Sequence, residues 1–333
     1  MIRLPRGGRR WLIVCSLAAT FAATGVSAQT EPPTPKPSAP VNEIPGSDTP
    51  VRQRPDDAWW TGPAIANSPS SLAPGHVYVE SYLFDVKSPG SDGIGSRTFL
   101  LYGLTDRLTV GLIPSFGFNK SNGGQSSSGV GLGDLALHAQ YRLTSYSAGR
   151  WIPTTAVALE ESLPTGRYDR LTRLNDGFGA GAYTTSLSWY AQSIFWLPNG
   201  RILRSRVNLS RTFASRADVE SVSIYGTPSG FRGSAHTGAS LSVDSSWEYS
   251  LSRGWALAID VLYRHGDKTD VYGSCGPRSV CSNSDPTDNV AVAPAVEFSW
   301  AANLGVLVGV RYIPNGTNTK SSVTPVIALS VLI

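Results

Sequence analysis

The stretch TGASLSVDSSWEYSLSRGWALAIDVLYRH, residues 237–265, alternates between two kinds of side chain. In its first half, Val243, Trp247 and Tyr249 fall at odd positions, whereas Asp244 and Glu248 fall at even ones. Such a period of two is typical of a β-strand with one apolar and one polar face. After a short Ser-Arg-Gly turn the alternation resumes, so the stretch predicts a β-hairpin.

Strand-length runs of the same kind continue through most of the chain. We expect twelve strands, at about residues 76–86, 96–104, 107–119, 130–143, 151–163, 178–196, 201–213, 237–251, 255–265, 288–299, 304–313 and 322–333. Longer loops alternate with short turns between these strands. This layout predicts an all-β fold over residues 74–333, a twelve-stranded antiparallel transmembrane β-barrel of the outer-membrane type. Closure of the barrel pairs every backbone group in lipid, which an open sheet cannot do.

Tryptophan positions indicate the orientation of this barrel. Indole rings favour the membrane–water interface because an apolar body carries a single N–H group. Six tryptophans fall near the predicted short turns, namely Trp151, Trp189, Trp196, Trp247, Trp255 and Trp300. We therefore expect an aromatic girdle at the turn end, which faces the periplasm in such barrels. Core tryptophans scattered through a soluble β-protein are the alternative.

The composition excludes other classes of protein. Only 16% of the 333 residues are charged, which is low for a soluble domain, and 41% are apolar, too many for a disordered chain. The 34 Gly and 23 Pro residues argue against a mainly helical fold.

Residues 1–28 have the pattern of a cleaved signal peptide. Arg3, Arg6, Arg9 and Arg10 precede an apolar run, and the small residues 26–28 supply a cleavage site. Cleavage would leave 24 basic against 24 acidic residues, so the pI near 9.0 gives no support for a nucleic-acid partner. A retained membrane anchor is the alternative. Export predicts that the protein lies in the cell outer membrane of a Gram-negative bacterium.

Residues 29–73 predict a disordered Pro-rich periplasmic linker, because eight prolines fall among polar residues between Glu31 and Asp57. The apolar pair Trp59-Trp60 and Ile65 follow, so the part near 58–66 is a candidate plug for the barrel.

Cys275 and Cys281 lie in a loop rich in Gly, Ser and Pro. After export, a small disulfide between them is expected. A zinc site is the weaker alternative, since no His lies at ligand spacing.

The polar faces of the strands would line the barrel lumen. The titratable candidates there are Glu80, Asp134, His138, Arg142, Glu160, Arg204, Arg206, Asp244, Glu248, Asp260, Arg264, Glu297 and Arg311. Charges buried away from water need partners, so we expect cross-strand pairs of Arg204 or Arg206 with Asp244 or Glu248. Two roles stay open for this set: holding the barrel together, or selecting permeants by charge and size.

Catalysis has little support in the sequence. His265 lies near the loop end of its strand on the lipid-facing side, where a lipid-modifying barrel enzyme would place its base, but no recognisable nucleophile motif accompanies it. His138 fits a hydrogen-bonded interior histidine. No phosphate loop or metal cluster is recognisable, so we expect neither an enzyme nor a cofactor.

Three segments resemble one family. YGLTDRLTVGL (102–112), GLGDLALHAQYRL (131–143) and SLPTGRYD (162–169) resemble recurring segments of the outer-membrane "transporter" family of the MetA pathway of phenol degradation. The resemblance covers roughly residues 74–333 and implies an outer-membrane barrel with a part in the uptake of small, often aromatic, compounds. Departures are the terminal Ile333, where an aromatic residue is usual, and Pro294 and Pro325 inside strands, which bulges would have to accommodate.

The sequence thus predicts an outer-membrane channel or transporter for small molecules, including hydrophobic or aromatic compounds, with the loops 214–236 and 266–287 as an external gate. Its expected partners are outer-membrane lipid, a small-molecule permeant and the barrel assembly machinery. A structural or adhesive barrel with binding loops is one alternative, and a lipid-modifying barrel enzyme is the second.

Overall fold

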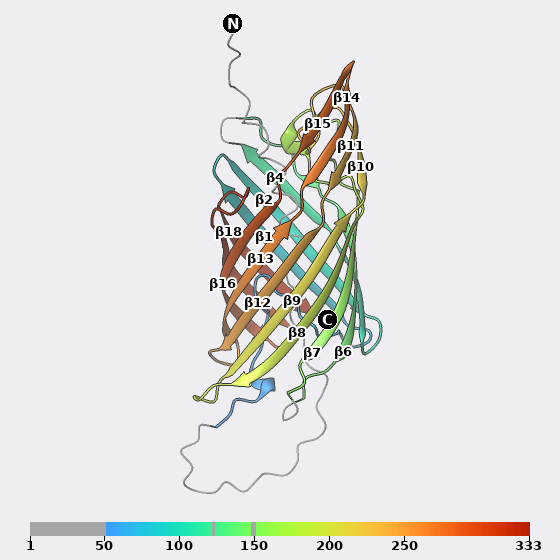
Figure 1. The fold of residues 1–333 in the computed structure, drawn as a ribbon. Coiled ribbons are helices and arrows are strands. Elements are labelled where there is room, and N and C mark those ends of the chain that lie inside the picture. The colour runs from blue at the N-terminus through green and yellow to red at the C-terminus, as the bar shows by residue number, and fades with distance from the viewer. Residues whose placement is uncertain (1–50, 122–123, 148–150) are drawn as a thin grey trace, which may run out of the picture.

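The computed structural model describes residues 51–333 apart from 122–123 and 148–150 (Figure 1). The predicted signal peptide, residues 1–28, and the linker up to residue 50 lie outside the described residues.

The chain forms a closed antiparallel barrel with tilted strands (Figure 1). Its wall consists of β1 (Val77–Ser88), β2 (Ser91–Gly103), β3 (Leu108–Ile113), β4 (Ser115–Ser121), β5 (Gly131–Leu132), β6 (Leu135–Thr144), β7 (Thr154–Leu163), β8 (Thr184–Trp196), β9 (Ile202–Ala214), β12 (Ser240–Ser250), β13 (Trp255–Gly266), β16 (Thr287–Ala301), β17 (Leu304–Ile313) and β18 (Ser322–Leu332). The ring closes because β1 pairs with both β2 and β18. β3 and β4 together form one wall strand, and so do β5 and β6, so the fourteen segments make twelve wall strands. The predicted twelve-stranded barrel is therefore confirmed.

Two wall strands are interrupted where the sequence predicted continuous ones. Pro114 separates β3 from β4 and lacks an N–H for the ladder, although its carbonyl still accepts a hydrogen bond from Thr98 N at 3.1 Å. Across from it, Gly133 and Asp134 separate β5 from β6, and Gly133 N donates to Ser115 O at 2.9 Å. The regular ladder is thus interrupted at one level on two neighbouring wall positions.

Connections at the two ends of the barrel differ, but not as strictly as predicted. We call the end with the β2–β3, β8–β9, β12–β13 and β16–β17 connections the turn end, and the opposite end the loop end. The loop predicted between the first two strands is wrong: β1 and β2 continue into a tight turn at Pro89 and Gly90. Gly90 permits this turn because its φ is 91°.

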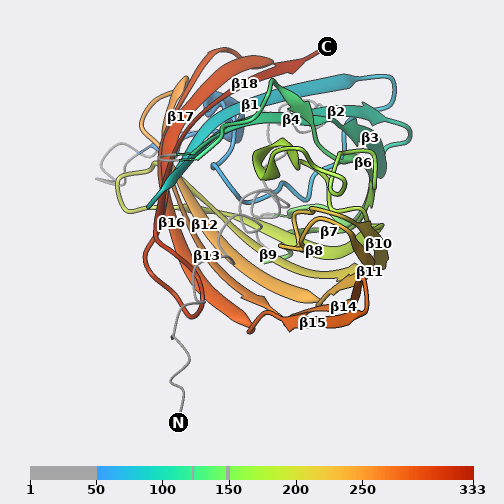
Figure 2. The ribbon, with the colours of Figure 1, turned by 90° about the horizontal axis from the view of Figure 1, so that it is seen from above.

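A second sheet extends beyond the loop end, in segments predicted to be loops. β10 (Arg216–Glu220), β11 (Phe231–Thr237), β14 (Thr269–Cys275) and β15 (Arg278–Asn283) pair in that order (Figure 1). The sheet has its own small core, which includes Val219, Phe231 and Val271. The connection between β7 and β8, with the short helix η2 (Leu174–Asp176), folds across the opening (Figure 2).

The predicted disulfide is not formed. Cys275 carries a free thiol, which donates to Ser229 O at 3.4 Å. The register of the β14–β15 hairpin pairs Cys275 with Arg278 and places Cys281 opposite Tyr272, so the two cysteines are not cross-strand neighbours. The extended hairpin replaces the compact loop that the spacing suggested.

The outer face of the barrel is apolar, as lipid requires. Leu83, Leu187 and Ile327 leave 45–54% of their surface exposed, and many other large apolar side chains are exposed along the strands. No helix among the described residues is long and apolar enough to span a membrane.

Four of the six tryptophans of the predicted girdle lie near the turn end. Trp151, Trp247, Trp255 and Trp300 are exposed near the turn end, and Phe298 packs between the last two at 4.5 and 5.2 Å between ring centroids. By contrast, Trp189 is exposed near the middle of β8, away from either end.

Trp196 is the other exception to the girdle. It shares the inward parity of Tyr190 on β8, and its indole N–H donates to Gln53 O at 2.8 Å. The period of two places this ring inside the barrel mouth, where it binds the chain that precedes β1.

No bulge accommodates the two strand prolines. Pairing between β16 and β17 is interrupted at Pro294, and the register is the same before and after the interruption. Pairing between β18 and β1 is interrupted at Pro325 in the same way. A gap of this kind tolerates the missing donor without inserting a residue. The one irregularity of β16 lies elsewhere, between Ser299 and Ala301.

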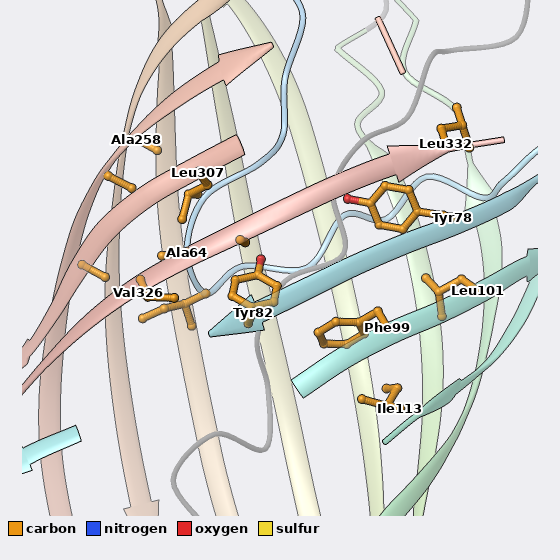
Figure 3. Close-up of a cluster of buried hydrophobic side chains, with 14 of the residues drawn as sticks. Ala64, Tyr78, Tyr82, Phe99, Leu101, Ile113, Ala258, Leu307, Val326 and Leu332 are labelled. Carbon is orange, nitrogen blue, oxygen red and sulfur yellow. The ribbon is translucent and has the colours of Figure 1, made fainter. Parts of the chain in front are cut away.

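The interior of the barrel has two unlike sides. One side, which we call the apolar wall, consists of Tyr78 and Tyr82 on β1, Phe99 and Leu101 on β2, Ile113 on β3, Leu307 on β17 and Val326 and Leu332 on β18 (Figure 3). The facing side, which we call the polar wall, carries buried charged and amide side chains on β9, β12, β13 and β16, namely Arg204, Arg206, Asn208, Asp244, Glu248, Asp260 and Glu297.

A segment from before β1 runs between these walls. Residues 58–72, which we call the inner segment, are mostly buried, and Ala66 has no exposed surface. In Figure 3 the chain around Ala64 passes beside the apolar wall inside the barrel.

Candidate channel lumen

An ion-pair network forms the centre of the polar wall. Arg204 on β9 makes two hydrogen bonds to the carboxylate of Glu248 on β12, its cross-strand partner. Arg206 Nε lies 3.5 Å from the same carboxylate and donates to Gln192 Oε1 at 2.9 Å. All of these charges are buried, so the pairing offsets the cost of removing them from water.

The beginning of the inner segment binds Glu297 on β16. Its Oε2 accepts hydrogen bonds from Thr61 N at 2.7 Å and from Gly62 N at 2.8 Å, and the Thr61 hydroxyl adds a third contact at 3.2 Å. Gly62 adopts a φ of 102°, so the turn that presents both amides to one oxygen requires glycine. Such charge-assisted bonds are stronger than neutral ones.

The middle of the inner segment binds the polar wall through its backbone. Ala66 N donates to Asp260 Oδ1 at 3.0 Å, and Arg206 Nη1 donates to Ala66 O at 2.9 Å. Next to it, Asn208 Nδ2 donates to Asn67 O at 3.2 Å. The polar wall thus supplies to a chain without regular structure the hydrogen bonds that a buried backbone needs.

The end of the inner segment crosses to other strands. Gln140 Nε2 on β6 donates to Ser70 O at 2.8 Å, and Leu72 N donates to Thr109 Oγ1 on β3 at 2.9 Å. From there the chain leaves at the turn end and begins β1.

Apolar side chains of the inner segment face the other way. Ile65 and Leu72 are 3% and 2% exposed and belong to the same buried cluster as the apolar wall. The inner segment therefore fills the space between the walls, with its backbone bound to the polar one and its apolar side chains packed with the apolar one.

Residues just before the inner segment and at its start are fixed at the turn end. Gln53 takes part in four hydrogen bonds with the barrel there, including N to Gly200 O at 2.8 Å and Nε2 to Ser250 Oγ at 2.8 Å. The Trp59 ring lies 4.6 Å from the guanidinium of Arg253, and Trp60 lies 4.4 Å from that of Arg204. These cation–π contacts explain the tryptophan pair that follows the proline-rich stretch.

A pocket lies above the inner segment, toward the loop end. Its cavity volume is about 30 Å³, which is room for about two water molecules. Asn67 and Tyr190 lie at its base, joined by a hydrogen bond of 3.0 Å, and Arg264 and Arg311 lie in its wall. We call this space the outer pocket.

Several other predicted lumen residues do face inward. Glu80 is buried in the apolar wall, where Oε1 accepts a hydrogen bond from Ser330 at 2.9 Å. Glu160 lies in the outer pocket and forms an ion pair of 2.7 Å with Arg97. His138 is also buried, but neither ring nitrogen has a hydrogen-bond partner among the described residues, contrary to the hydrogen-bonded histidine predicted.

Two of the predicted lumen residues lie at the ends of the barrel instead. Asp134 fixes the β7–β8 connection, since its two oxygens accept hydrogen bonds from Gly166 N at 2.8 Å and Ala180 N at 2.7 Å. Arg142 donates to Asp106 O in the β2–β3 turn at 2.9 Å. Both residues therefore have local structural partners.

His265 lies on the outer surface near the loop end. Its Nδ1 is 2.8 Å from Asp288 Oδ1, which also accepts a hydrogen bond from the Tyr263 hydroxyl, and its Nε2 is 3.3 Å from Asp267. Both ring nitrogens thus contact carboxylates, and no serine hydroxyl takes part in this group of contacts. The arrangement is that of an exposed ion-pair cluster.

The sequence patterns missed several residues of the lumen. Arg97, the partner of Glu160, lies in a run of β2 where apolar residues point to both sides, so the period of two gives no contrast. Gln192 was missed among polar residues of β8, and the backbone amides of the inner segment carry no sequence signal at all.

Comparison with known proteins now adds a family. A family model described as "Putative MetA-pathway of phenol degradation" matches residues 62–322, from inside the inner segment to the last strand. The chain belongs to that family. The predicted resemblance is therefore confirmed, and the match includes most of the inner segment as well as the barrel. No curated protein matches the chain.

Solved structures agree with the barrel fold. A crystal structure of an outer membrane channel from Pseudomonas putida F1 is 16% identical, with a TM-score of 0.59, and the alignment covers 80% of this chain and 98% of that one. At this identity the likeness shows the fold alone, an outer-membrane β-barrel.

Two further structures are more distant. The TodX deltaS2S3 mutant monoaromatic hydrocarbon channel is 12% identical, with a TM-score of 0.46, over 86% of this chain and 98% of that one. The KdgM porin is 7% identical, with a TM-score of 0.39, over 75% and 97%. Scores this low carry no argument about function.

Proposed function

We propose that the protein is an outer-membrane channel for small molecules, with the inner segment as its plug. The observation that carries this proposal is that the lumen is filled by residues 58–72, which belong to no wall strand and are held by hydrogen bonds and packing. A barrel that served only as a scaffold could fill its interior with side chains from its own wall. Because the inner segment is not part of the wall, it could leave the lumen and open the channel while the barrel stays closed.

The apolar wall is the observation that favours hydrophobic or aromatic compounds as the permeants. Displacement of the inner segment would expose Tyr82, Phe99 and Leu307 on one side of the lumen and the charges of the polar wall on the other. A permeant with an apolar ring could then pass along one side while water and polar groups occupy the other. The comparison channel from Pseudomonas putida F1 shares the fold that this function requires.

The remaining parts of the proposal concern export and orientation. A signal peptide at residues 1–28 would deliver the chain to the periplasm, and the assembly machinery would insert it with the turn end facing the periplasm. The plug would then lie at the periplasmic side, with the linker of residues 29–57 leading to it.

A structural or adhesive role is the second candidate, and one observation favours it. The sheet of β10, β11, β14 and β15 extends from the loop end with its own core, as a binding platform would. Deletion of residues 266–287 would abolish partner binding by such a barrel without changing its conductance. A lipid-modifying activity would instead require His265, so hydrolysis in mixed micelles that His265→Ala abolishes would support it.

The channel is tested by single-channel recording of the refolded mature chain in planar bilayers. The parent should show small conductance steps, and a variant lacking residues 29–70 should show severalfold larger ones, with heat-modifiable gel migration confirming that both are folded. Equal conductance of the two would refute the plug, and a folded barrel silent in both forms would refute the channel.

A further inference from the structure

We propose that a calcium ion binds to the polar wall between Asp244, Asp260 and Asn208, where it fastens the inner segment. The binding itself is independent of the channel, but its effect on opening rests on the proposed channel function. The three side chains come from β12, β13 and β9, so no local sequence motif marks the site.

The polar wall carries more negative than positive charge. Four of its side chains are carboxylates, and two are guanidinium groups. Glu248 pairs with both arginines, and backbone amides hold one oxygen of Glu297. Arg206 attracts the carboxylates of Asp244 and Asp260, but its hydrogen bonds go to other groups. Because buried charges need compensation, the two missing positive charges call for a divalent cation.

Buried oxygens at this place lack hydrogen-bond partners. Asp244 is 4% exposed, and neither of its carboxylate oxygens has a partner of regular geometry among the described residues, although the amide of the adjacent Ser245 stabilises its charge. Asp260 Oδ2, Asn208 Oδ1 and Ser246 Oγ are also buried, and they too have no partner in the described part of the chain. Such atoms are rare in proteins and point to a bound water or ion.

The strand register brings these oxygens together. Asn208 is the cross-strand partner of Asp244, and Asp260 is the partner of Ser246, two residues further along β12. Side chains at partner positions are about 4.5–5.5 Å apart at Cβ, and diagonal ones about 7–8 Å. The carboxylates of Asp244 and Asp260 are close enough to repel each other. A calcium ion, whose ligands lie at about 2.3–2.6 Å, can therefore contact oxygens from all three strands.

A small cavity lies beside these groups. Its volume is about 10 Å³, and Asp244, Asn208 and Asn67 are among the residues that line it. It has room for one water-sized particle and excludes an organic ligand.

The chemistry of the donors favours calcium. All of them are oxygens, and calcium accepts irregular sets of carboxylate, amide and water oxygens, whereas magnesium demands octahedral geometry. The described residues contain no group of three or more His, Cys, Asp or Glu side chains that could hold a metal. Two carboxylates with amide, hydroxyl and water oxygens would therefore make a weak site.

The site adjoins two contacts of the inner segment. Asp260 uses its other oxygen for Ala66 N, and Asn208 uses its amide nitrogen for Asn67 O. A cation between the remaining oxygens would remove the repulsion between the carboxylates and hold both side chains where they bind the segment. Loss of the cation would therefore loosen the middle of the segment.

Equilibrium dialysis tests the site. The refolded mature chain, free of lipopolysaccharide and stripped with a chelator, would be dialysed in a nonionic detergent against calcium from about 10 µM to about 10 mM. Mass spectrometry would then measure the bound metal. We expect one calcium ion per chain with a Kd on the order of 10⁻⁴ M, and magnesium binding that is about tenfold weaker or more. A parent chain that binds no calcium would overturn the proposal.

Variants locate the ion. Asp244→Asn keeps the shape and removes a charge, so it should weaken calcium binding about tenfold or more. Asn208→Asp adds a carboxylate and should strengthen binding severalfold, which locates the site even if Asp244→Asn does not fold. Asp134→Asn is the matched control, because both oxygens of Asp134 already accept backbone hydrogen bonds, and it should bind calcium like the parent. If the Asp244 and Asn208 variants also bind like the parent, the site is wrong.

Failure of this inference and failure of the channel proposal can be told apart. In bilayer recordings, replacing calcium by a chelator should make large openings severalfold more frequent in the parent but not in Asp244→Asn. One bound ion in a barrel that is silent in both buffers would support the site and refute the channel. Openings in a chain that binds no calcium would leave the channel standing and refute the site. Bound calcium with openings that the chelator does not change would overturn its hold on the segment.

Discussion

The two sides of the barrel interior bind the inner segment through different interactions. The apolar wall contacts Ile65 and Leu72, whose burial is non-directional and depends on the area removed from water. The polar wall contacts backbone groups of Thr61, Gly62 and Ala66, at single atoms and fixed distances. The apolar side therefore supplies affinity that tolerates sliding, and the polar side sets the register of the segment.

This difference matters for a plug. A segment that was bound only by apolar packing would have no defined position, and one that was bound only by buried charges would leave those charges unpaired on release. In this barrel Arg204 and Arg206 pair with Glu248 on a wall strand, and the inner segment takes no part in these ion pairs. We expect the ion pairs to persist when the lumen opens, whereas Glu297 and Asp260 lose the backbone amides that they bind.

The largest effect is expected from Arg206→Ala. Arg206 joins Glu248, Gln192 and Ala66 O, so its loss leaves a buried carboxylate with one fewer partner and should destabilise the barrel by about 3–5 kcal/mol. Arg211→Ala on the same strand breaks an exposed ion pair and should cost about 0–1 kcal/mol. Urea unfolding in micelles would measure both. A similar loss of unfolding free energy in the two variants would mean that the ion pairs of the polar wall do not stabilise the barrel more than an exposed pair does.

A smaller and more local effect is expected from Ile65→Ala. The side chain is 3% exposed in the apolar cluster, and its truncation should weaken docking of the inner segment by about 2–4 kcal/mol. The barrel itself should keep its unfolding midpoint. Hydrogen exchange of residues 58–72 would report the loosening, with the amides of β12 as internal reference. Unchanged protection in the segment would contradict packing against the apolar wall.

Glu297→Ala tests the polar contacts of the segment. The change removes the acceptor of Thr61 N and Gly62 N, and should weaken docking by about 1.5–3 kcal/mol. Open events in bilayer recordings should become more frequent. Asp134→Ala is the matched control, because it removes a carboxylate that binds two backbone amides at the loop end. If the control opens the pore equally often, the contacts of Glu297 do not hold the plug.

The smallest effect is expected at the interrupted wall strand. A Cβ on Gly131 would lie 2.0 Å from Phe178 Cδ2, so Gly131→Ala should displace the β7–β8 connection at a cost of about 1–2 kcal/mol. Gly129→Ala meets nothing within 4 Å and serves as control. Thermal unfolding followed by gel migration compares the two. Equal unfolding midpoints would show that the Phe178 ring can move aside and that its packing on Gly131 does not stabilise the wall.

The sequence predicted the barrel well where the two faces of a strand differ. On β12, Val243 and Trp247 face out while Asp244 and Glu248 face in, and this contrast gave the strand and its orientation. On β2, both Phe99 inside and Leu100 outside are apolar, so neither the apolar wall nor the inward Arg97 was predicted. A period of two cannot mark a strand whose faces are alike.

The contacts of the inner segment lie beyond any local pattern. Thr61 and Glu297 are 236 residues apart in sequence, and Ala66 and Asp260 are 194 apart. These hydrogen bonds use backbone amides, which every residue except proline carries. The aromatic pair and Ile65 indicated that the region would dock, but only the closed barrel brings its binding groups together.

The most direct test of the central claim is a reversible tether between the inner segment and the polar wall. Asn67→Cys with Asn208→Cys would place a cysteine pair at two positions that are joined by a hydrogen bond of 3.2 Å from the Asn208 side chain to the Asn67 carbonyl, in a background with Cys275→Ser and Cys281→Ser. Bilayer recordings would compare the oxidised and the reduced protein. We expect the tethered barrel to show only small conductance steps, and large openings to appear after reduction. Failure of the pair to cross-link in the folded barrel, or large openings in the oxidised form, would contradict a plug that binds the polar wall and moves to open the channel.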